Sequence, residues 1–246
     1  MILRRAQDTA PQGAQDADIS GLDARPSSLD TLVAALGQRE QLATFAGLRP
    51  GQGDQARQAA VLILIGDAGS GLELMFVERA TTLRKHAGQI AFPGGARDDG
   101  DVDLADTALR ETVEETDIDR TGVDVLGSLP PVHVAVSGFD VTGVVAWWRQ
   151  RSPVRVVDPR EIAAVWMAPV AQLVDPDHRA RVHHPSGYTG PAFEVNGHLV
   201  WGLTAHLLSG VLDLAGWQRP WNRARFLEIP TRYLTDRRDF GGPDAH

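Results

Sequence analysis

The most informative part of this chain is Phe92-Pro93-Gly94-Gly95, followed fifteen residues after Gly95 by Arg110-Glu111-Thr112-Val113-Glu114-Glu115. Residues 104–116 contain no Gly or Pro, and Asp103 stands where a helix N-cap is expected. Apolar residues recur there every four positions, at Ala105, Leu109 and Val113. This period is typical of one apolar helix face, so the sequence predicts a helix shortly after a tight glycine loop.

Three carboxylates crowd the face of this helix opposite its apolar residues. At about 100° per residue, Glu111, Glu114 and Glu115 fall within an arc of roughly 100°. Like charges at this spacing repel, and Arg110 relieves only part of the repulsion. Mg²⁺ suits such a cluster, because it takes oxygen ligands and combines a few carboxylates with waters and substrate phosphates. A solvated acidic face is the alternative for the helix taken alone.

The glycine loop decides between these two interpretations. Gly94 and Gly95 allow backbone conformations that are closed to other residues, so the loop can approach a metal or a phosphate closely. An ordinary turn is the alternative for the loop alone. Loop and helix together indicate a magnesium-bound phosphate site.

These residues resemble the signature of the Nudix hydrolases, which runs G, five residues, E, seven residues, then R-E-U-x-E-E-x-G-U with U aliphatic. Gly95 and the run from Arg110 to Glu115 match it. The chain departs from it at four points: Asp101 replaces the first Glu, one extra residue precedes Arg110, Thr112 takes an aliphatic position, and Asp117 replaces the last Gly. Asp117 remains compatible with a left-handed helix terminus, which Asp tolerates better than most residues.

The resemblance implies roles for the residues that match. It implies a metal site formed by Glu111, Glu114, Glu115 and Gly95. It also implies that Arg110 orients these glutamates. The general base stays open between one of the glutamates, such as Glu114, and Glu161 from a later loop.

A second resemblance, to the coenzyme A pyrophosphatase branch of the family, narrows the substrate. It rests on the spacing of Arg79-Ala80, Arg84, Gly88 and Phe92-Pro93-Gly94-Gly95. Met75-Phe76-Val77 departs from the Leu-Leu-Thr that begins the branch motif. Two later segments also look like this branch, so that the resemblance covers roughly residues 59–218: Ser137-Gly138-Phe139-Asp140-Val141 and Trp201-Gly202-Leu203-Thr204-Ala205.

The branch resemblance implies that the substrate is bound by Arg79, Arg84, Gly88, Phe92 and Gly94. Cationic donors beside the metal loop agree with this, because a pyrophosphate and a ribose phosphate would lie there. Lys85, in the same loop, is expected to pair with surface acids instead.

The expected function is hydrolysis of a pyrophosphate bond in coenzyme A or its derivatives, with Mg²⁺ or Mn²⁺ as cofactor. The products would be adenosine 3′,5′-bisphosphate and a phosphopantetheine. A Nudix pyrophosphatase for ADP-ribose or another nucleoside diphosphate derivative is one alternative. A non-catalytic, nucleotide-sensing Nudix domain is the other.

Composition excludes several other classes of protein. The net charge of -8 over 246 residues argues against a nucleic-acid binder. The absence of Cys excludes disulfides and thiol catalysis, and no apolar run is long enough for a membrane span or a signal peptide. We therefore expect a cytoplasmic enzyme whose partner is a small-molecule nucleotide, with no nucleic acid and no membrane; a homodimer is compatible with this.

The expected fold class is α+β, with a Nudix-like mixed β-sheet sandwiched between helices. Residues 1–58 are expected to be an N-terminal extension, partly disordered, with a helix from 29 to about 45 or two shorter helices; 59–218 the Nudix domain; and 219–246 a tail. The predicted elements after residue 58 are strands at 60–65, 72–78, 89–92, 123–129, 141–148 and 162–167, helices at 104–116, 170–174 and 203–214, and a hairpin of 192–195 with 198–201.

Two further groups of residues have ordinary structural explanations. A metal site built from His183, His184, His198 and His206 is disfavoured, because adjacent side chains on a strand point to opposite faces. Trp147 and Trp148 are expected, for the same reason, to be one core and one surface aromatic rather than a base-stacking platform.

Overall fold

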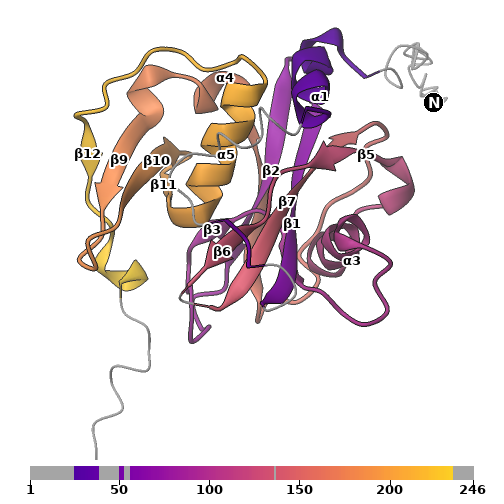
Figure 1. Cartoon of the computed structure of the whole chain (residues 1–246), viewed down its shortest axis with the longest axis horizontal. Helices are drawn as coiled ribbons and strands as arrows, with labels where there is room; N and C mark the ends of the chain where they lie inside the picture. The colour runs from indigo at the N-terminus through magenta and orange to yellow at the C-terminus, as the bar shows by residue number, and fades with distance from the viewer. Residues whose placement is uncertain (1–24, 39–49, 53–55, 136, 235–246) are drawn as a thin grey trace, which may run out of the picture.

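The computed structural model describes residues 25–38, 50–52, 56–135 and 137–234. Within this part of the chain the strands form two sheets, with helices packed on both faces of the larger one (Figure 1). The predicted α+β class, a mixed sheet between helices, is confirmed.

The larger sheet has its central strands in the order β3-β2-β1-β7-β5, and β4, β6 and β8 pair with β1, β7 and β2. β1 and β7 run parallel over nine residue pairs, whereas the other pairs of this sheet are antiparallel. Its strands are β1 (Arg57–Asp67), β2 (Leu72–Arg79), β3 (Ile90–Ala91), β4 (Gly94–Ala96), β5 (Val123–Ser128), β6 (Val132–Val134), β7 (Phe139–Trp148) and β8 (Ile162–Pro169).

The smaller sheet has the order β11-β10-β9-β12 and lies at the left of Figure 1. Its strands are β9 (Arg179–His183), β10 (Thr189–Val195), β11 (His198–Val200) and β12 (Phe226–Leu227). The α-helices are α1 (Asp30–Leu36), α3 (Leu104–Thr116), α4 (Val170–Leu173) and α5 (Gly202–Leu214). A 3-10 turn, η6 (Thr231–Tyr233), follows β12.

Helix α3 has the bounds and both ends that the sequence predicts. The Asp103 side chain accepts a hydrogen bond from the amide of Asp106 at 2.8 Å, which caps the first turn. Asp117 ends the helix in the left-handed conformation, with φ 57° and ψ 22°. These ends fix where α3 begins after the glycine loop.

The core lies on both faces of the larger sheet. On one face α3 contributes Ala108 and Leu109, which pack with Leu62 and Leu64 of β1. On the other face a larger cluster joins α1, α5, the larger sheet and β10 of the smaller sheet. Because the two sheets share this second cluster, β10, β11 and α5 belong to the same core as β1 and β7.

Several elements differ from the expectation. Strands β4, β6, β9 and β12 are not among the predicted elements. β4, β6 and β12 have only two or three residues, whereas β9 alternates apolar Ala180 and Val182 with polar residues, a signal that the prediction missed. The helix expected from residue 29 to about 45 ends at Leu36, with Gly37 as its C-cap, and residues 39–49 lie outside the described residues. Trp147 and Trp148 are both buried, so the expected surface position was wrong: the sheet is covered on both faces.

The hairpin around Asn196-Gly197 is confirmed, with φ 52° and 76° at the two turn residues. The boundary at residue 218 stays a prediction. The described part of 219–246 contains β12, which pairs with β9, and Tyr233, which is buried against the smaller sheet. Among the described residues, no helix is long and apolar enough to cross a membrane.

Candidate active site

The glycine loop lies directly against α3. The Glu115 carboxylate accepts a hydrogen bond from the Gly94 amide at 3.1 Å. A Cβ added at Gly95 would lie 2.5 Å from each carboxylate oxygen of Glu111. Only glycine leaves room here, so the loop forms a cradle that admits two carboxylates of α3 against the backbone of β4.

Arg110 ties this loop to the helix through a fork of hydrogen bonds. Its guanidinium donates to both carboxylate oxygens of Asp101, at 2.8 and 3.0 Å, and to the carbonyl of Ala96 at 3.0 Å. It also donates to Glu111 at 3.0 Å and to Glu114 at 3.2 Å. One cation therefore sets the position of three acids.

Asp101 is buried at the position where the family signature has its first glutamate. Besides Arg110, it accepts hydrogen bonds from the hydroxyl of Thr107 at 2.8 Å and the amide of Asp98 at 2.9 Å. The hydrogen bonds from Arg110, followed by that from Asp98, hold the pKa of Asp101 well below its ordinary value. The shorter side chain of Asp101 thus reaches Arg110, and its part is to hold that residue.

Glu115 and Glu111 carry charges that the surroundings disfavour. Glu115 is 8% exposed, and burial raises its pKa to about 8, against the lowering effect of the Gly94 amide. Burial also raises the pKa of Glu111, although the hydrogen bond from Arg110 lowers it. Of these two desolvated carboxylates only Glu111 is paired with Arg110, so a further cation would be stabilised in this region.

Arg79 and Glu161 lie close enough to Glu115 to act on its charge. The positive charge of Arg79 lowers the pKa of Glu115, while the negative charges of Glu111 and Glu161 raise it. The β2–β8 pairing brings the two residues together, and the Ala80 amide donates to the Glu161 carbonyl at 2.8 Å. The Arg79 Nε is buried and has no hydrogen-bond partner among the described residues. Residues far apart in sequence thus meet at one end of the glycine loop.

The other predicted substrate residues are placed differently from one another. Arg84 is exposed in the loop between β2 and β3, and Gly88 is buried at the base of that loop with φ 68°. Phe92 points into the core, where its ring stacks on Phe76 with centroids 4.9 Å apart. The prediction that Phe92 binds the substrate is therefore not supported for its ring, which packs in the core beneath the glycine loop and not beside the carboxylates.

The predicted metal ligands are only partly brought together. Within the described residues, no three His, Asp or Glu side chains are arranged so that they could hold an ion by themselves. The Glu114 side chain is 59% exposed and turned to Arg110. Glu111 and Glu115 lie against the glycine loop and offer hard oxygen donors whose charge is unfavourably buried. They fit a divalent ion that completes its coordination shell with water and phosphate.

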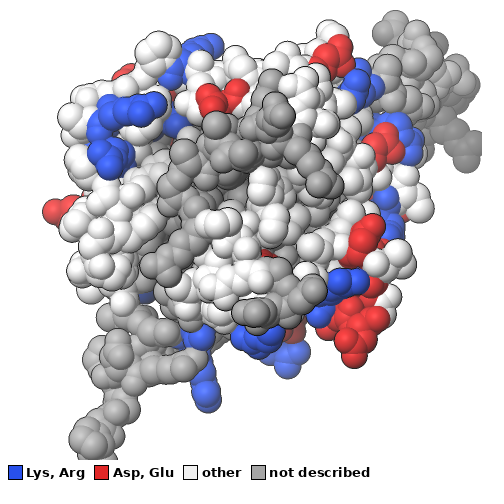
Figure 2. Space-filling view, viewed as in Figure 1, with Lys and Arg blue, Asp and Glu red and all other residues white. Residues whose placement is uncertain are grey.

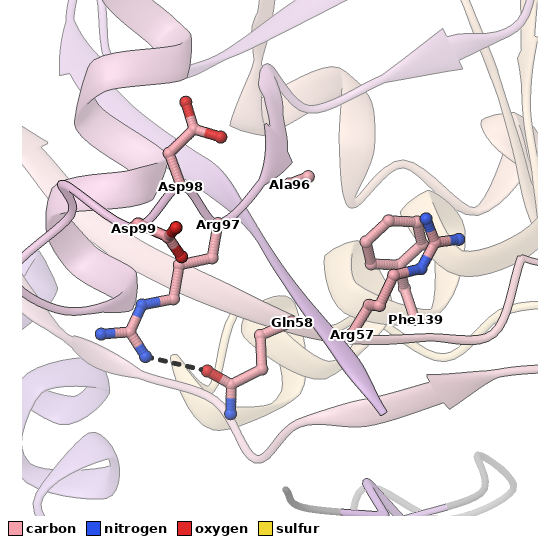
Figure 3. A pocket seen from close by; sticks show the side chains of 7 residues that line it. All are labelled: Arg57, Gln58, Ala96, Arg97, Asp98, Asp99 and Phe139. Carbon is pink, nitrogen blue, oxygen red and sulfur yellow. Dashed lines mark hydrogen bonds between the residues drawn. The ribbon is translucent and has the colours of Figure 1, made fainter. Parts of the chain in front are cut away.

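Beside Ala96 lies an open cavity of about 420 Å³ that the sequence did not reveal (Figure 3). The Arg57 guanidinium lies 4.1 Å from the centre of the Phe139 ring, and Arg97 donates to the side chain of Gln58 at 3.0 Å. The residues lining the cavity are Arg57, Gln58, Ala96, Arg97, Asp98, Asp99 and Phe139. Of these residues, only Phe139 was singled out by the sequence, as part of the segment from Ser137 to Val141 that resembles the coenzyme A pyrophosphatase branch.

Comparisons with known proteins identify the family of this chain. The family model described as NUDIX domain matches residues 56–186. A protein of Cronobacter sakazakii named uncharacterized Nudix hydrolase NudL is 40% identical over 174 residues, covering 68% of this chain and 88% of the relative. Its counterpart in Escherichia coli O1:K1 is 41% identical over 159 residues, covering 62% and 79%.

The solved structures that match this chain are less similar to it in sequence. The Nudix hydrolase RenU of M. smegmatis has a TM-score of 0.48 at 17% identity, covering 68% of this chain and 91% of that one. A Nudix hydrolase of Alicyclobacillus acidocaldarius has a TM-score of 0.44 at 21% identity, covering 64% and 91%.

The domain match spans more than half of the chain, and this chain covers most of the length of relatives at 40% identity. The protein therefore belongs to the Nudix hydrolases, metal-dependent enzymes that hydrolyse pyrophosphate bonds.

Proposed function

We propose that this Nudix hydrolase cleaves the pyrophosphate of coenzyme A or its derivatives, with Mg²⁺ or Mn²⁺ as cofactor, to adenosine 3′,5′-bisphosphate and a phosphopantetheine. The observation that carries the proposal is the position of Arg79, from the motif typical of that branch, at the end of β2, where its charge lowers the pKa of Glu115 in α3. Arg84 lies in the loop that follows Arg79, and this loop would supply further cationic groups to the substrate phosphates.

Each residue of the site has a distinct part in this proposal. Glu111 and Glu115, with Gly95, hold the divalent ion, while Arg110 keeps Glu111 and Glu114 oriented. When bound, such an ion offsets phosphate charge and lowers the pKa of an attacking water. Arg79 and Arg84 donate to phosphate oxygens, and Gly88 and Gly94 shape the backbone around them.

The proton of the attacking water is accepted by a carboxylate, and two candidates remain. Glu161 is exposed and lies within electrostatic range of Glu115, whereas Glu114 is committed to Arg110. The pH profile of kcat for Glu161→Gln and Glu114→Gln distinguishes them. The variant of the true base loses the limb of the profile that reports the base, and the other variant keeps it.

A substrate panel with and without Mg²⁺ tests the activity itself. Wild-type protein is expected to release adenosine 3′,5′-bisphosphate from coenzyme A faster than it cleaves ADP-ribose. Preference for ADP-ribose would instead support a pyrophosphatase for nucleoside diphosphate derivatives. Binding of nucleotide without turnover would support a sensing domain.

Arginine variants test the substrate preference. Arg79→Ala or Arg84→Ala should lower kcat/KM for coenzyme A about ten- to hundredfold, since each lost charge-assisted contact costs roughly 1.5–3 kcal/mol. ADP-ribose, which lacks the 3′-phosphate, should be affected less. Lys85→Ala is the matched control in the same loop. An equal fall on both substrates would mean that these arginines hold only the shared pyrophosphate.

Glu115→Gln tests the metal site, because it removes charge with little change in volume. We expect turnover to fall by at least about a hundredfold in a folded variant. Asp101→Asn should cost less, because Asp101 acts on the site through Arg110. Near-normal activity of a folded Glu115→Gln protein would refute the assignment.

We also propose a cellular location, a partner and an assembly for this enzyme. A chain without Cys and with net charge -8 suits the cytoplasm, with a small nucleotide as partner and no nucleic acid. A homodimer is proposed as its assembly, and light scattering at several protein concentrations measures it.

A further inference from the structure

The segment that ends the described chain packs against the substrate loop, although it lies outside the residues that match the family model. Tyr233 is 7% exposed and belongs to a small core with Ile229 and, from the smaller sheet, Val182 and Leu199. The smaller sheet therefore fixes Tyr233 in place. The family match ends at residue 186, so this contact belongs to the part of the chain beyond it.

From this position Tyr233 contacts the base of the loop between β2 and β3. The Gln89 side chain donates to the Tyr233 carbonyl at 3.4 Å. A Cβ added at Gly88 would lie 3.5 Å from Cε1 of the Tyr233 ring, and Gly88 has φ 68°, which favours glycine. Ring and backbone of Tyr233 thus rest on two successive residues of the loop.

Those two residues close the loop that carries the cationic groups. The Gly88 amide donates to the Arg79 carbonyl at 3.0 Å, and the Arg79 amide donates to the Gln89 carbonyl at 3.0 Å. Arg79, bound at both its amide and its carbonyl, is the residue whose charge acts on Glu115. A continuous chain of contacts therefore runs from Tyr233 through Gly88 and Gln89 to Arg79.

We propose that Tyr233 is a positioning residue for substrate specificity: it holds the loop from Arg79 to Gln89 in the conformation that presents its arginines to the substrate phosphates. This inference rests on the proposed function of that loop. The smaller sheet, through Tyr233, would then determine which phosphorylated substrate reaches the carboxylates of α3.

The ring, rather than the hydroxyl, carries this role. The hydroxyl accepts a hydrogen bond from Arg232 at 3.2 Å, and Arg232 is exposed and lies over the ring with its guanidinium carbon 4.8 Å from the centroid. Tyr233→Phe keeps the surface that faces Gly88 and loses only this outer contact, whereas Tyr233→Ala removes the surface itself.

Steady-state kinetics of full-length variants tests the proposal. We expect Tyr233→Ala to raise KM for coenzyme A about tenfold and to leave kcat within about twofold, because loop order affects phosphate binding more than the chemical step. Tyr233→Phe should restore the wild-type KM. Phe226→Ala, in the same segment but 52% exposed, is the control for a general effect of altering this segment. Equal KM values for Tyr233→Ala and wild type would overturn the proposal.

Hydrogen exchange separates failure of this proposal from failure of the proposed function. In Tyr233→Ala, the amides of Arg79 and Gly88 should exchange at least about tenfold faster, while the amide of Leu62 in β1 keeps its protection. This readout needs no substrate. Unchanged protection in the loop would refute the positioning role even if coenzyme A is hydrolysed, and faster exchange in a protein that does not cleave coenzyme A would refute the substrate alone.

Discussion

Glu115 is the residue of the site at which burial most strongly opposes ionisation. It is nearly buried, yet its carboxylate has to be ionised to bind a cation. The glycine loop offers it one backbone amide, and Arg79 acts on it only through space. The ionised Glu115 carboxylate therefore lowers the stability of the folded protein until a cation binds to it.

The stability of the metal-free protein should depend on the protonation of Glu115. Its pKa of about 8 in the folded protein lies above the ordinary 4.5, so the folded state binds this proton more tightly than the unfolded state. This contribution is fully present below pH 4.5 and is lost as the pH rises through 8. Urea titrations in chelator should show unfolding free energy falling between these values, by at most ~1.4 kcal/mol per pH unit. Glu115→Gln should flatten that slope, and an unchanged slope would contradict the assignment.

The two glycines of the loop should respond differently to alanine. At Gly94, φ is 151° and an added Cβ would lie 2.6 Å from Cα of Val61, where backbone cannot yield. Gly94→Ala should therefore lower the unfolding free energy by at least ~2 kcal/mol. At Gly95 the obstacle is the flexible end of Glu111, so Gly95→Ala should change stability by less than ~1 kcal/mol and still lower activity at least ~tenfold. Thermal melts and kinetics on both variants check this, and similar stability losses would count against it.

Helix α3 shows how an element accommodates departures from a family signature. Thr112, at a position that is aliphatic in the signature, is fully buried, and its hydroxyl donates to the Ala108 carbonyl at 2.7 Å. Thr116 donates to the Thr112 carbonyl in the same way. Because the helix backbone satisfies these hydroxyls, polar side chains are tolerated on a buried face.

The N-cap of α3 should carry measurable stability, because Asp103 satisfies an otherwise free amide in the first turn. Asp103→Ala is expected to lower the unfolding free energy by ~1 kcal/mol. Asp99→Ala, which removes a neighbouring exposed acid of the same loop, is the control. Urea unfolding measures both, and equal effects would show that charge rather than capping is responsible.

Over the whole molecule, the hydrophobic core extends further along the chain than the residues that match the family model. The match ends at residue 186, but the core around α5 continues beyond it. The buried residues supplied from there include Phe193, Val195, Val200, Leu207, Leu208, Val211 and Leu212. Figure 1 shows α5 between the two sheets, where its loss would expose apolar surface on both.

In the view of Figure 2, the Lys, Arg, Asp and Glu side chains of the described residues lie mainly toward the margins of the molecule.

A truncated chain tests this extent of the core. A protein that ends after residue 186 should show no cooperative melting transition, because each of the buried core side chains beyond it contributes ~1.5–3 kcal/mol and typical domains have only ~5–15 kcal/mol to lose. A protein that ends after Leu234 keeps all of these residues and should melt cooperatively. Circular dichroism during heating compares the two, and a cooperative melt of the shorter chain would contradict a shared core.

Local features of this protein can be derived from its sequence alone. The bounds and caps of α3 and the hairpin at Asn196-Gly197 follow from residue spacing, because capping, helical period and turn conformation depend on near neighbours. The same reasoning predicted that a glycine loop and acidic residues would meet. It placed the three glutamates on one face, but could not say which of them the sheet would bury.

Burial, long-range strand pairing and the electrostatics of the site depend on tertiary contacts. The tertiary structure buried Glu115 and left Glu114 exposed, placed Phe92 in the core, and brought Glu161 and Arg79 to the same carboxylate through the pairing of β2 with β8. Short strands such as β4 and β12 exist because neighbouring strands supply their hydrogen bonds, which a local pattern does not record. Burial and long-range pairing depend on which distant segments pack together, and therefore the electrostatics of the site became visible only in the folded chain.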